Sequence, residues 1–266
     1  MTPAEIEAAA SRLFEAEQRG EQCGLLSLAY PDMSLDDAYA VQDAFVALKE
    51  ATGLSRIGWK IGLTSRAMQQ ALGITTPDSG VLLSDMLFHS GNSVPNGRFI
   101  QPRIEAEIAF VMKKNLSGAG TTRADVLAAT DYVAPALEIL DTRVMRADPE
   151  TGRSRVIFDT VADNAANAGV VLGTARHDPK AFDLAWVGAI VTRDGVVEET
   201  GLGAGVLGDP VMGMVWLVQR LASYNCGLSA GDIVLSGSFI RPLEAPAGSE
   251  IQANFGAFGE ISLAFE

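Results

Sequence analysis

The chain has 266 residues, of which 48% are apolar and 20% are charged, so it can bury a substantial core in one or two domains. Its formal net charge of −13 argues against binding to nucleic acid or to an anionic membrane, because both require clusters of lysine and arginine. The segment MTPAEIEAAA has no secretory signal pattern, no apolar run reaches ~18 residues, and Cys23 and Cys226 lie far apart. We therefore expect a cytoplasmic protein without a disulfide framework or a zinc site.

Residues 1–55 are predicted to form a helical N-terminal region. TPAE at 2–5 is a capping-box pattern with Pro3 at the first helical position, and SLDD at 34–37 repeats the capping signal. Apolar residues follow each cap at helical spacing: Ile6, Leu13 and Phe14 after the first, and Ala38, Val41, Phe45 and Leu48 after the second. Gly53 ends this pattern.

Residues 56–266 have the short apolar or alternating runs that are typical of strands, and they form the predicted catalytic domain. Asp194-Gly195 predicts a hairpin turn, and two further helices are predicted after TRAD (122–125) and at Asp209-Pro210. Because strands outnumber helices and do not alternate with them, we expect an α+β fold with a mixed or mostly antiparallel sheet. The expected strands lie within residues 57–64, 104–112, 133–140, 168–173, 188–199, 232–239 and 260–266.

The segment IEAEIAF at 104–110 places two glutamates on one face of a predicted strand. Side chains alternate along a strand, so Glu105 and Glu107 lie roughly 6–7 Å apart on the same face and repel each other unless a cation lies between them. Glu138 lies in the apolar run 133–140, where a buried carboxylate must be paired, protonated or bound to a metal. Three carboxylates without a histidine cluster suit a hard cation such as Mg²⁺. The residues alone leave open that Glu105 and Glu107 form a solvated pair on an edge strand.

Two other segments carry polar residues with an open role. Ser238 in SGSF resembles a nucleophile only weakly, because His89 and His177 are the sole histidines and neither has the sequence context of a triad. Asn164 in VADNAANAG either caps a helix or lines a pocket, and position alone does not separate these roles.

Six segments carry a family resemblance along nearly the whole chain. They resemble, in this order, the hydratase/decarboxylase branch of the fumarylacetoacetate hydrolase superfamily. The resemblance implies a mixed β-roll or barrel with a helical N-terminal region, and a homo-oligomer. The segments are KIGLTS (60–65), PDSGVLLSDMLFH (77–89), PRIEAEIAFV (102–111), ATDYVAPALEILDTR (129–143), FDTVADNAANAG (158–169) and LSGSFIRP (235–242).

The resemblance also implies the parts of an active site. Glu105, Glu107 and Glu138 match the family's metal ligands, for Mg²⁺ or Mn²⁺, and Lys60 and Asp78 match a lysine and an aspartate of its pocket. We assign Lys60 to proton transfer near the 2-oxo group of the substrate, and Asp78 to orienting water or carrying protons, with the two roles open to exchange. From the residues alone, Lys60 is also consistent with a structural ion pair, and Asp78 with a turn.

Two departures from the family pattern affect the expected chemistry. The histidine paired with a carboxylate in the hydrolase branch has no counterpart here, which disfavours hydrolysis of a carbon–carbon bond. Ile240 also stands where relatives often have threonine. This weakens the expectation that the segment of Ser238 binds substrate as in those relatives, although Ser238 can still donate a hydrogen bond.

Within this branch, the stretch 148–169, with its basic segment before FDT, most resembles members that act on 2-oxo-hept-4-ene-1,7-dioate, an intermediate of homoprotocatechuate breakdown, and the resemblance implies that substrate here. Arg153 and Arg155 lie there, and the planar guanidinium of Arg155, placed on a predicted strand, suits the second carboxylate of a dioate. The residues alone leave open that both arginines only solubilise a surface loop of an acidic protein. Hydration of 2-hydroxypenta-2,4-dienoate and decarboxylation of 4-oxalocrotonate are the sibling alternatives. A non-catalytic partner subunit of a hydratase/decarboxylase complex is the alternative of another class, and retention of all five matched residues argues against it.

Overall fold

The computed structural model describes residues 1–66, 69–70 and 74–266, which form two open β-sheets and a layer of helices. Most neighbouring strands are antiparallel, and three pairs are parallel. In this described part neither sheet closes into a barrel, so the mixed fold of the predicted family is confirmed with open sheets. Within the same residues, no helix combines the length and the hydropathy that crossing a membrane requires.

The larger sheet holds the predicted site strands at its centre. Its order is β2 (Asp78–Leu83), β1 (Arg56–Gly62), β10 (Ile233–Leu235), β5 (Arg103–Met112), β6 (Thr130–Leu140), β7 (Asn167–Leu172) and β3 (Leu87–His89), and β11 (Leu243–Glu244) also pairs with β5. The smaller sheet has the order β4 (Ser93–Val94), β13 (Glu260–Phe265), β12 (Glu250–Asn254), β8 (Gly188–Arg193) and β9 (Val196–Leu202).

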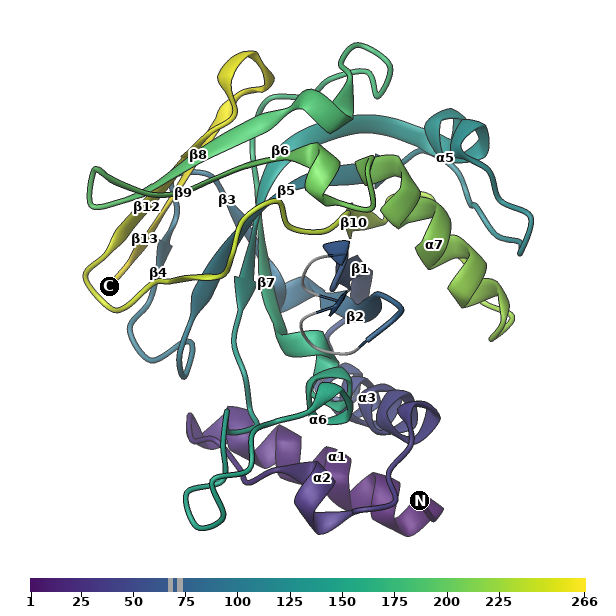
Figure 1. Cartoon of the computed structure of the whole chain (residues 1–266), viewed down its shortest axis with the longest axis vertical. Coiled ribbons are helices and arrows are strands. Elements are labelled where there is room, and N and C mark those ends of the chain that lie inside the picture. Colours follow the sequence, from purple (N-terminus) through teal and green to yellow (C-terminus); the bar gives the residue numbers. More distant parts are fainter. Residues whose placement is uncertain (67–68, 71–73) are drawn as a thin grey trace.

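The helices begin where the sequence places their caps. Thr2 and Ser34 each accept a hydrogen bond from the backbone three residues later and form the predicted capping boxes. Thr122 caps the helix at 123–129 in the same way, whereas Asp209 caps the helix at 210–222 by accepting from the N–H of Val211, two residues later. The helices are α1 (Pro3–Arg19), α2 (Leu26–Ala29), α3 (Leu35–Glu50), α5 (Arg123–Ala129), α6 (Ile157–Ala162) and α7 (Pro210–Ala222). Figure 1 shows α1, α2, α3 and α6 together at one end of the molecule, below the sheets.

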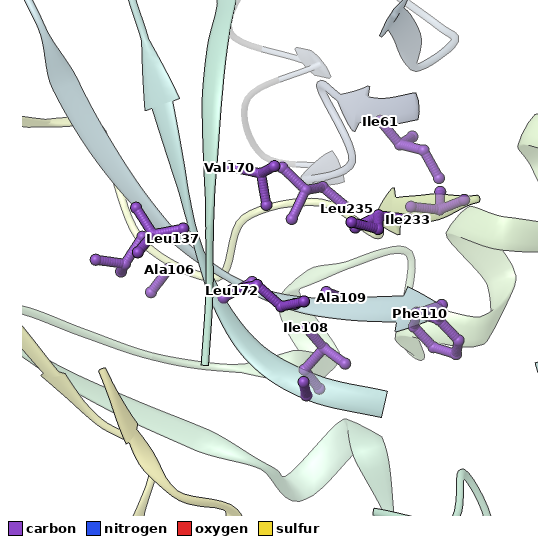
Figure 2. Packing of buried hydrophobic residues seen from close by; sticks show 14 of the residues in the cluster. Ile61, Ala106, Ile108, Ala109, Phe110, Leu137, Val170, Leu172, Ile233 and Leu235 are labelled. Atoms are coloured by element: carbon purple, nitrogen blue, oxygen red, sulfur yellow. The ribbon is translucent and has the colours of Figure 1, made fainter. Parts of the chain in front are cut away.

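Two apolar clusters divide the core. One packs α1 to α3 against residues of the segment 144–162, and the other fills the space around both sheets. Figure 2 shows buried side chains of β5 in the second cluster, including Ala106, Ile108 and Phe110. These positions alternate with Glu105 and Glu107, so one face of β5 packs in the core while the other carries the acidic pair. The division into 1–55 and 56–266 stays a prediction.

Two strands differ from the predicted elements. The alternative that Asp78 is a turn residue is wrong, because Asp78 begins β2, a strand that was not predicted and whose six residues are all buried. The strand expected within 232–239 ends at Leu235, because Gly237 has a φ of 121° and its N–H turns toward Glu107. The hairpin prediction is confirmed, with positive φ at both Asp194 and Gly195.

Candidate metal centre and cavity

Glu105, Glu107 and Glu138 form a cluster of carboxylates on two neighbouring strands. The pairing of β5 with β6 sets Glu105 directly opposite Glu138, and Glu107 follows on the same face of β5. Each residue offers one oxygen, and these oxygens all lie within 4.8 Å of one another. β5 is a central strand, and Glu107 and Glu138 are fully buried. The alternative of a solvated pair on an edge strand is therefore wrong.

The electrostatics of the cluster fit a divalent cation. Burial raises the pKa of all three carboxyls, and burial together with the nearby charge of Glu138 raises the pKa of Glu105 to about 8. Oε1 of Glu107 and both carboxylate oxygens of Glu138 are buried without a hydrogen-bond partner. Buried carboxylate oxygens without a hydrogen bond are unfavourable, and an all-carboxylate set suits a hard cation such as Mg²⁺ or Mn²⁺. The residues present thus suit the predicted ion.

Lys60 on β1 and Asp78 on β2 extend the cluster with a buried ammonium and a fourth carboxyl. Nζ of Lys60 lies 3.4 Å from Oε1 of Glu138, so the predicted ion pair of Lys60 exists. Burial lowers the pKa of Lys60, but attraction by Glu138 and Asp78 outweighs burial and raises it. Burial also raises the pKa of Asp78, against the opposing effect of Lys60. The raised pKa of Asp78 suits this carboxyl to proton transfer, whereas the raised pKa of Lys60 keeps its ammonium charged beside the cluster.

Glycine at position 62 leaves room for this pair. Gly62 lies opposite Asp78 in the pairing of β1 with β2. A Cβ at Gly62 would lie 2.2 Å from Oδ1 of Asp78 and 2.9 Å from Nζ of Lys60. Any larger residue would displace one of the two side chains, so the chain approaches the site closely only because residue 62 is glycine.

A cavity of about 530 Å³ opens beside the cluster. Lys60, Asp78 and Glu105 line one side, and residues 238–242 line another. The smaller sheet contributes Glu199 from β9, which is ion-paired with Arg241 at 2.6 Å. The volume lies within the range of roughly 300–1,000 Å³ that is usual for small-molecule sites. Glu107 and Glu138 lie buried behind this surface.

Ser238 and Asn164 meet the cavity differently. Ser238 lines it, and its Oγ donates a hydrogen bond to the carbonyl of Ile240 at 2.9 Å. Asn164 is fully buried: its Oδ1 accepts from the N–H of Val81 at 2.7 Å, and its Nδ2 donates to the carbonyl of Val81 at 2.9 Å. The side chain of Asn164 is therefore not brought to the cavity surface, which the next residue, Ala165, lines instead.

Three arginines line the cavity: Arg241, which is paired with Glu199, and Arg103 and Arg155, of which sequence reasoning identified Arg155. Arg155 lies there, but in the irregular segment before α6, so the prediction that it lies on a strand is wrong. Arg153 is exposed and is not part of the cavity wall. Arg103, which the sequence analysis missed, lines the cavity from β5. The alternation that joins Glu105 to Glu107 also includes Arg103, so the signal was present in the sequence.

Fold and site together define a mixed α/β protein with a carboxylate metal centre beside a small-molecule cavity. The chain belongs to the fumarylacetoacetate hydrolase family, since the family described as "Fumarylacetoacetate (FAA) hydrolase C-terminal" matches residues 60–264. The predicted family is thereby confirmed.

The chain is similar to known proteins over almost its whole length. It is 51% identical to 2-oxo-hept-4-ene-1,7-dioate hydratase of Escherichia coli over 256 residues, 96% of each chain. It is 37% identical to 2-keto-4-pentenoate hydratase of Paraburkholderia xenovorans, across 100% of this chain and 97% of that protein. A solved structure of 4-oxalocrotonate decarboxylase from Pseudomonas putida, complexed with magnesium and adipate, matches with a TM-score of 0.93 at 32% identity, over 100% of this chain and 99% of that one.

Proposed function

We propose that the protein is a divalent-metal-dependent hydratase that adds water to 2-oxo-hept-4-ene-1,7-dioate, giving 4-hydroxy-2-oxoheptane-1,7-dioate. The observation that carries this proposal is the cluster of Glu105, Glu107 and Glu138, with its unpartnered buried oxygens, beside Lys60 and Asp78 in one cavity. The 51% identity to a hydratase of this substrate supports the choice of reaction.

Glu105, Glu107 and Glu138 would hold Mg²⁺ or Mn²⁺. When bound, such an ion supplies Lewis acidity toward the carboxylate and the 2-oxo oxygen of the substrate. A structure of the similar decarboxylase contains magnesium, which supports the choice of ion. Ser238 lies at the cavity surface, where its hydroxyl can orient the substrate. Asn164 acts indirectly in this proposal, by holding the cavity wall.

In this proposal Asp78 carries the protons, and Lys60 holds a positive charge beside the reacting atoms. The carbon 4–carbon 5 double bond must first move into conjugation with the ketone, which takes a proton from carbon 3 and adds one at carbon 5. Water then adds at carbon 4, and carbon 3 regains a proton. Asp78, whose pKa burial raises, is suited to accept and return a proton, and Lys60 stabilises negative charge near the 2-oxo end.

Assembly and location complete the proposal. We propose a homo-oligomer in the cytoplasm, acting on a small 2-oxo dioic acid and associating with a decarboxylase of the same pathway. The similarity over full length to both hydratases and a decarboxylase supports a shared architecture for such partners. Light scattering of the purified chain, alone and mixed with the decarboxylase, measures both assemblies.

An activity assay tests the proposal. The purified protein with Mg²⁺ is given the seven-carbon dioate, 2-hydroxypenta-2,4-dienoate and 4-oxalocrotonate in turn, and loss of dienoate absorbance and release of carbon dioxide are followed. We expect hydration with the highest kcat/KM on the dioate, loss of activity with EDTA and recovery with added Mg²⁺. A preference for the five-carbon acid or carbon dioxide release would favour a sibling activity. Inactivity on all three would favour the non-catalytic subunit.

A further inference from the structure

Two arginines of the cavity lack a counter-ion. Arg103 and Arg155 are partly buried, and among the described residues neither side chain makes a hydrogen bond or an ion pair. Nη1 of Arg155 is buried without any partner. Burial lowers the pKa of both guanidiniums, and the positive charges of Arg146 and Arg155 lower that of Arg103 further. An anion between them would satisfy free donors and relieve this repulsion.

The acidic side chains near this arginine pair already have partners. Glu199, which lines the cavity, pairs with Arg241 at 2.6 Å, and Glu244, which lies opposite Arg103 in the pairing of β11 with β5 and outside this cavity, pairs with Arg146 at 3.5 Å. Glu105 shares a face of β5 with Arg103, but its carboxylate belongs to the metal cluster. The protein thus leaves one pair of guanidiniums for an anion that comes from outside.

A seven-carbon diacid held at the cluster reaches farther along the cavity than a five-carbon monoacid. Arg103 and Glu105 are two residues apart on one face of β5, a separation of roughly 6–7 Å along the strand. Six carbon–carbon bonds of about 1.5 Å give a dioate an extended span of roughly 7–8 Å between its carboxyl carbons. A five-carbon monoacid held at the cluster ends two bonds short and carries no second charge.

We propose that Arg103 and Arg155 together bind the second carboxylate of the substrate and thereby select seven-carbon dioates over five-carbon monoacids. The inference rests on the proposed function and names the residues that set the substrate's length and charge. The planar guanidinium presents paired donors to a carboxylate, and partial burial strengthens each charged hydrogen bond. Arg103 comes from β5 and Arg155 from the segment before α6, so the fold brings two distant segments to one carboxylate.

Equilibrium binding tests the inference without requiring turnover. Affinities for 2-oxoheptanedioate and 2-oxopentanoate, which lack the reacting double bond, are measured by calorimetry with saturating Mn²⁺. We expect Arg103→Met and Arg155→Met each to weaken the dioate at least tenfold, about 1.4 kcal/mol, and to leave 2-oxopentanoate unchanged. Arg153→Met removes the same charge from an exposed position of the same segment and should change neither affinity.

Lysine variants keep the inference testable if the methionine variants fail to fold. Arg103→Lys and Arg155→Lys keep the positive charge but lose the paired N–H donors of the guanidinium. We therefore expect a smaller loss of affinity than in the methionine variants, again for the dioate alone. Equal losses on both ligands, or no loss on the dioate, would overturn the inference. Hydration of the dioate by Arg variants with wild-type KM would also overturn it while leaving the proposed function intact. Conversely, arginine-dependent dioate binding by a protein that hydrates no dienoate supports the subsite and contradicts the proposed function.

Discussion

Glu107 meets two demands with its two carboxylate oxygens. Oε2 accepts the N–H of Gly237 at 2.7 Å, while Oε1 is buried without a partner in the described structure. A glutamine can still accept from Gly237 but removes the negative charge that a cation needs. A glutamine variant at position 107 therefore tests the metal site while keeping the hydrogen bond to Gly237.

Glu107→Gln should leave the fold intact and weaken Mn²⁺ binding at least about 100-fold, because one of three charged ligands is lost. Circular dichroism measures the fold, and electron paramagnetic resonance of free Mn²⁺ measures the binding. Glu199→Gln is the matched control, since Glu199 lines the same cavity outside the cluster and should leave Mn²⁺ affinity unchanged. Wild-type affinity in the Glu107 variant would contradict the ligand assignment.

Lys60 and Asp78 are expected to affect chemistry more than binding. Lys60→Ala and Asp78→Asn should each lower kcat by roughly 10²–10⁴. Metal affinity should stay equal or rise in Lys60→Ala, because the variant removes a positive charge 3.4 Å from a carboxylate oxygen of Glu138. Steady-state kinetics and Mn²⁺ titration of each variant check this. A large rise in KM with little change in kcat would make the two residues substrate-positioning groups.

At the scale of elements, a left-handed turn forms the wall of the cavity between α6 and β7. Asn164, Ala165 and Ala166 have φ values of 51°, 52° and 61°, a conformation that L-residues rarely adopt in succession. The buried pair of Arg143 and Asp163 precedes this turn and bonds to the backbone around it. Packing and hydrogen bonds thus hold strained residues where they line the site.

Asn164→Ala should lower the free energy of unfolding by about 1–3 kcal/mol, because the buried N–H of Val81 loses its acceptor. The carbonyl of Val81 keeps a donor from Asn167 at 2.9 Å. Urea denaturation measures the change. Asn225→Ala is the control, since Asn225 has a φ of 56° but is exposed, so its variant reports left-handed strain alone. Equal destabilisation of both variants would mean that the buried hydrogen bonds contribute nothing.

At the scale of the whole molecule, stability should depend on pH and metal together. The folded-state pKa values of the cluster lie above the ordinary value of 4.5, and that of Glu105 is about 8. Without metal, the folded state therefore binds more protons than the unfolded state between these values. The contribution of the cluster to stability is full below pH 4.5 and is lost as pH rises toward 8.

Mg²⁺ should reverse this loss. Protons compete with the cation for the same oxygens, so millimolar Mg²⁺ should raise the free energy of unfolding more at pH 8 than at pH 5. Urea denaturation at both pH values, with Mg²⁺ or with EDTA, measures the difference. The Glu107→Gln variant should lose most of it. An equal effect of Mg²⁺ at both pH values would argue against carboxylates of raised pKa as its site.

Sequence patterns of short range determined much of this protein. Capping boxes at Thr2 and Ser34, the turn at Asp194-Gly195 and the alternation of Glu105 with Glu107 each depend on residues a few positions apart. Resemblance to the family then added Lys60 and Asp78, which the structure brings to one cavity. Local backbone geometry fixes such features wherever the rest of the chain lies.

Only the tertiary structure decided which distant residues meet. Pairing of β5 with β6 sets Glu138 opposite Glu105, and the fold brings Arg155 to the cavity that Arg103 lines. The same packing turns the side chain of Asn164 toward β2 and away from the cavity surface, so of the two roles that the sequence left open its side chain does not take that of lining the pocket. Contacts between segments far apart along the chain depend on strand register and layer packing, which no local pattern specifies. For this reason the sequence predicted the metal ligands and Arg155, and the structure added Arg103 as the second arginine of the pair.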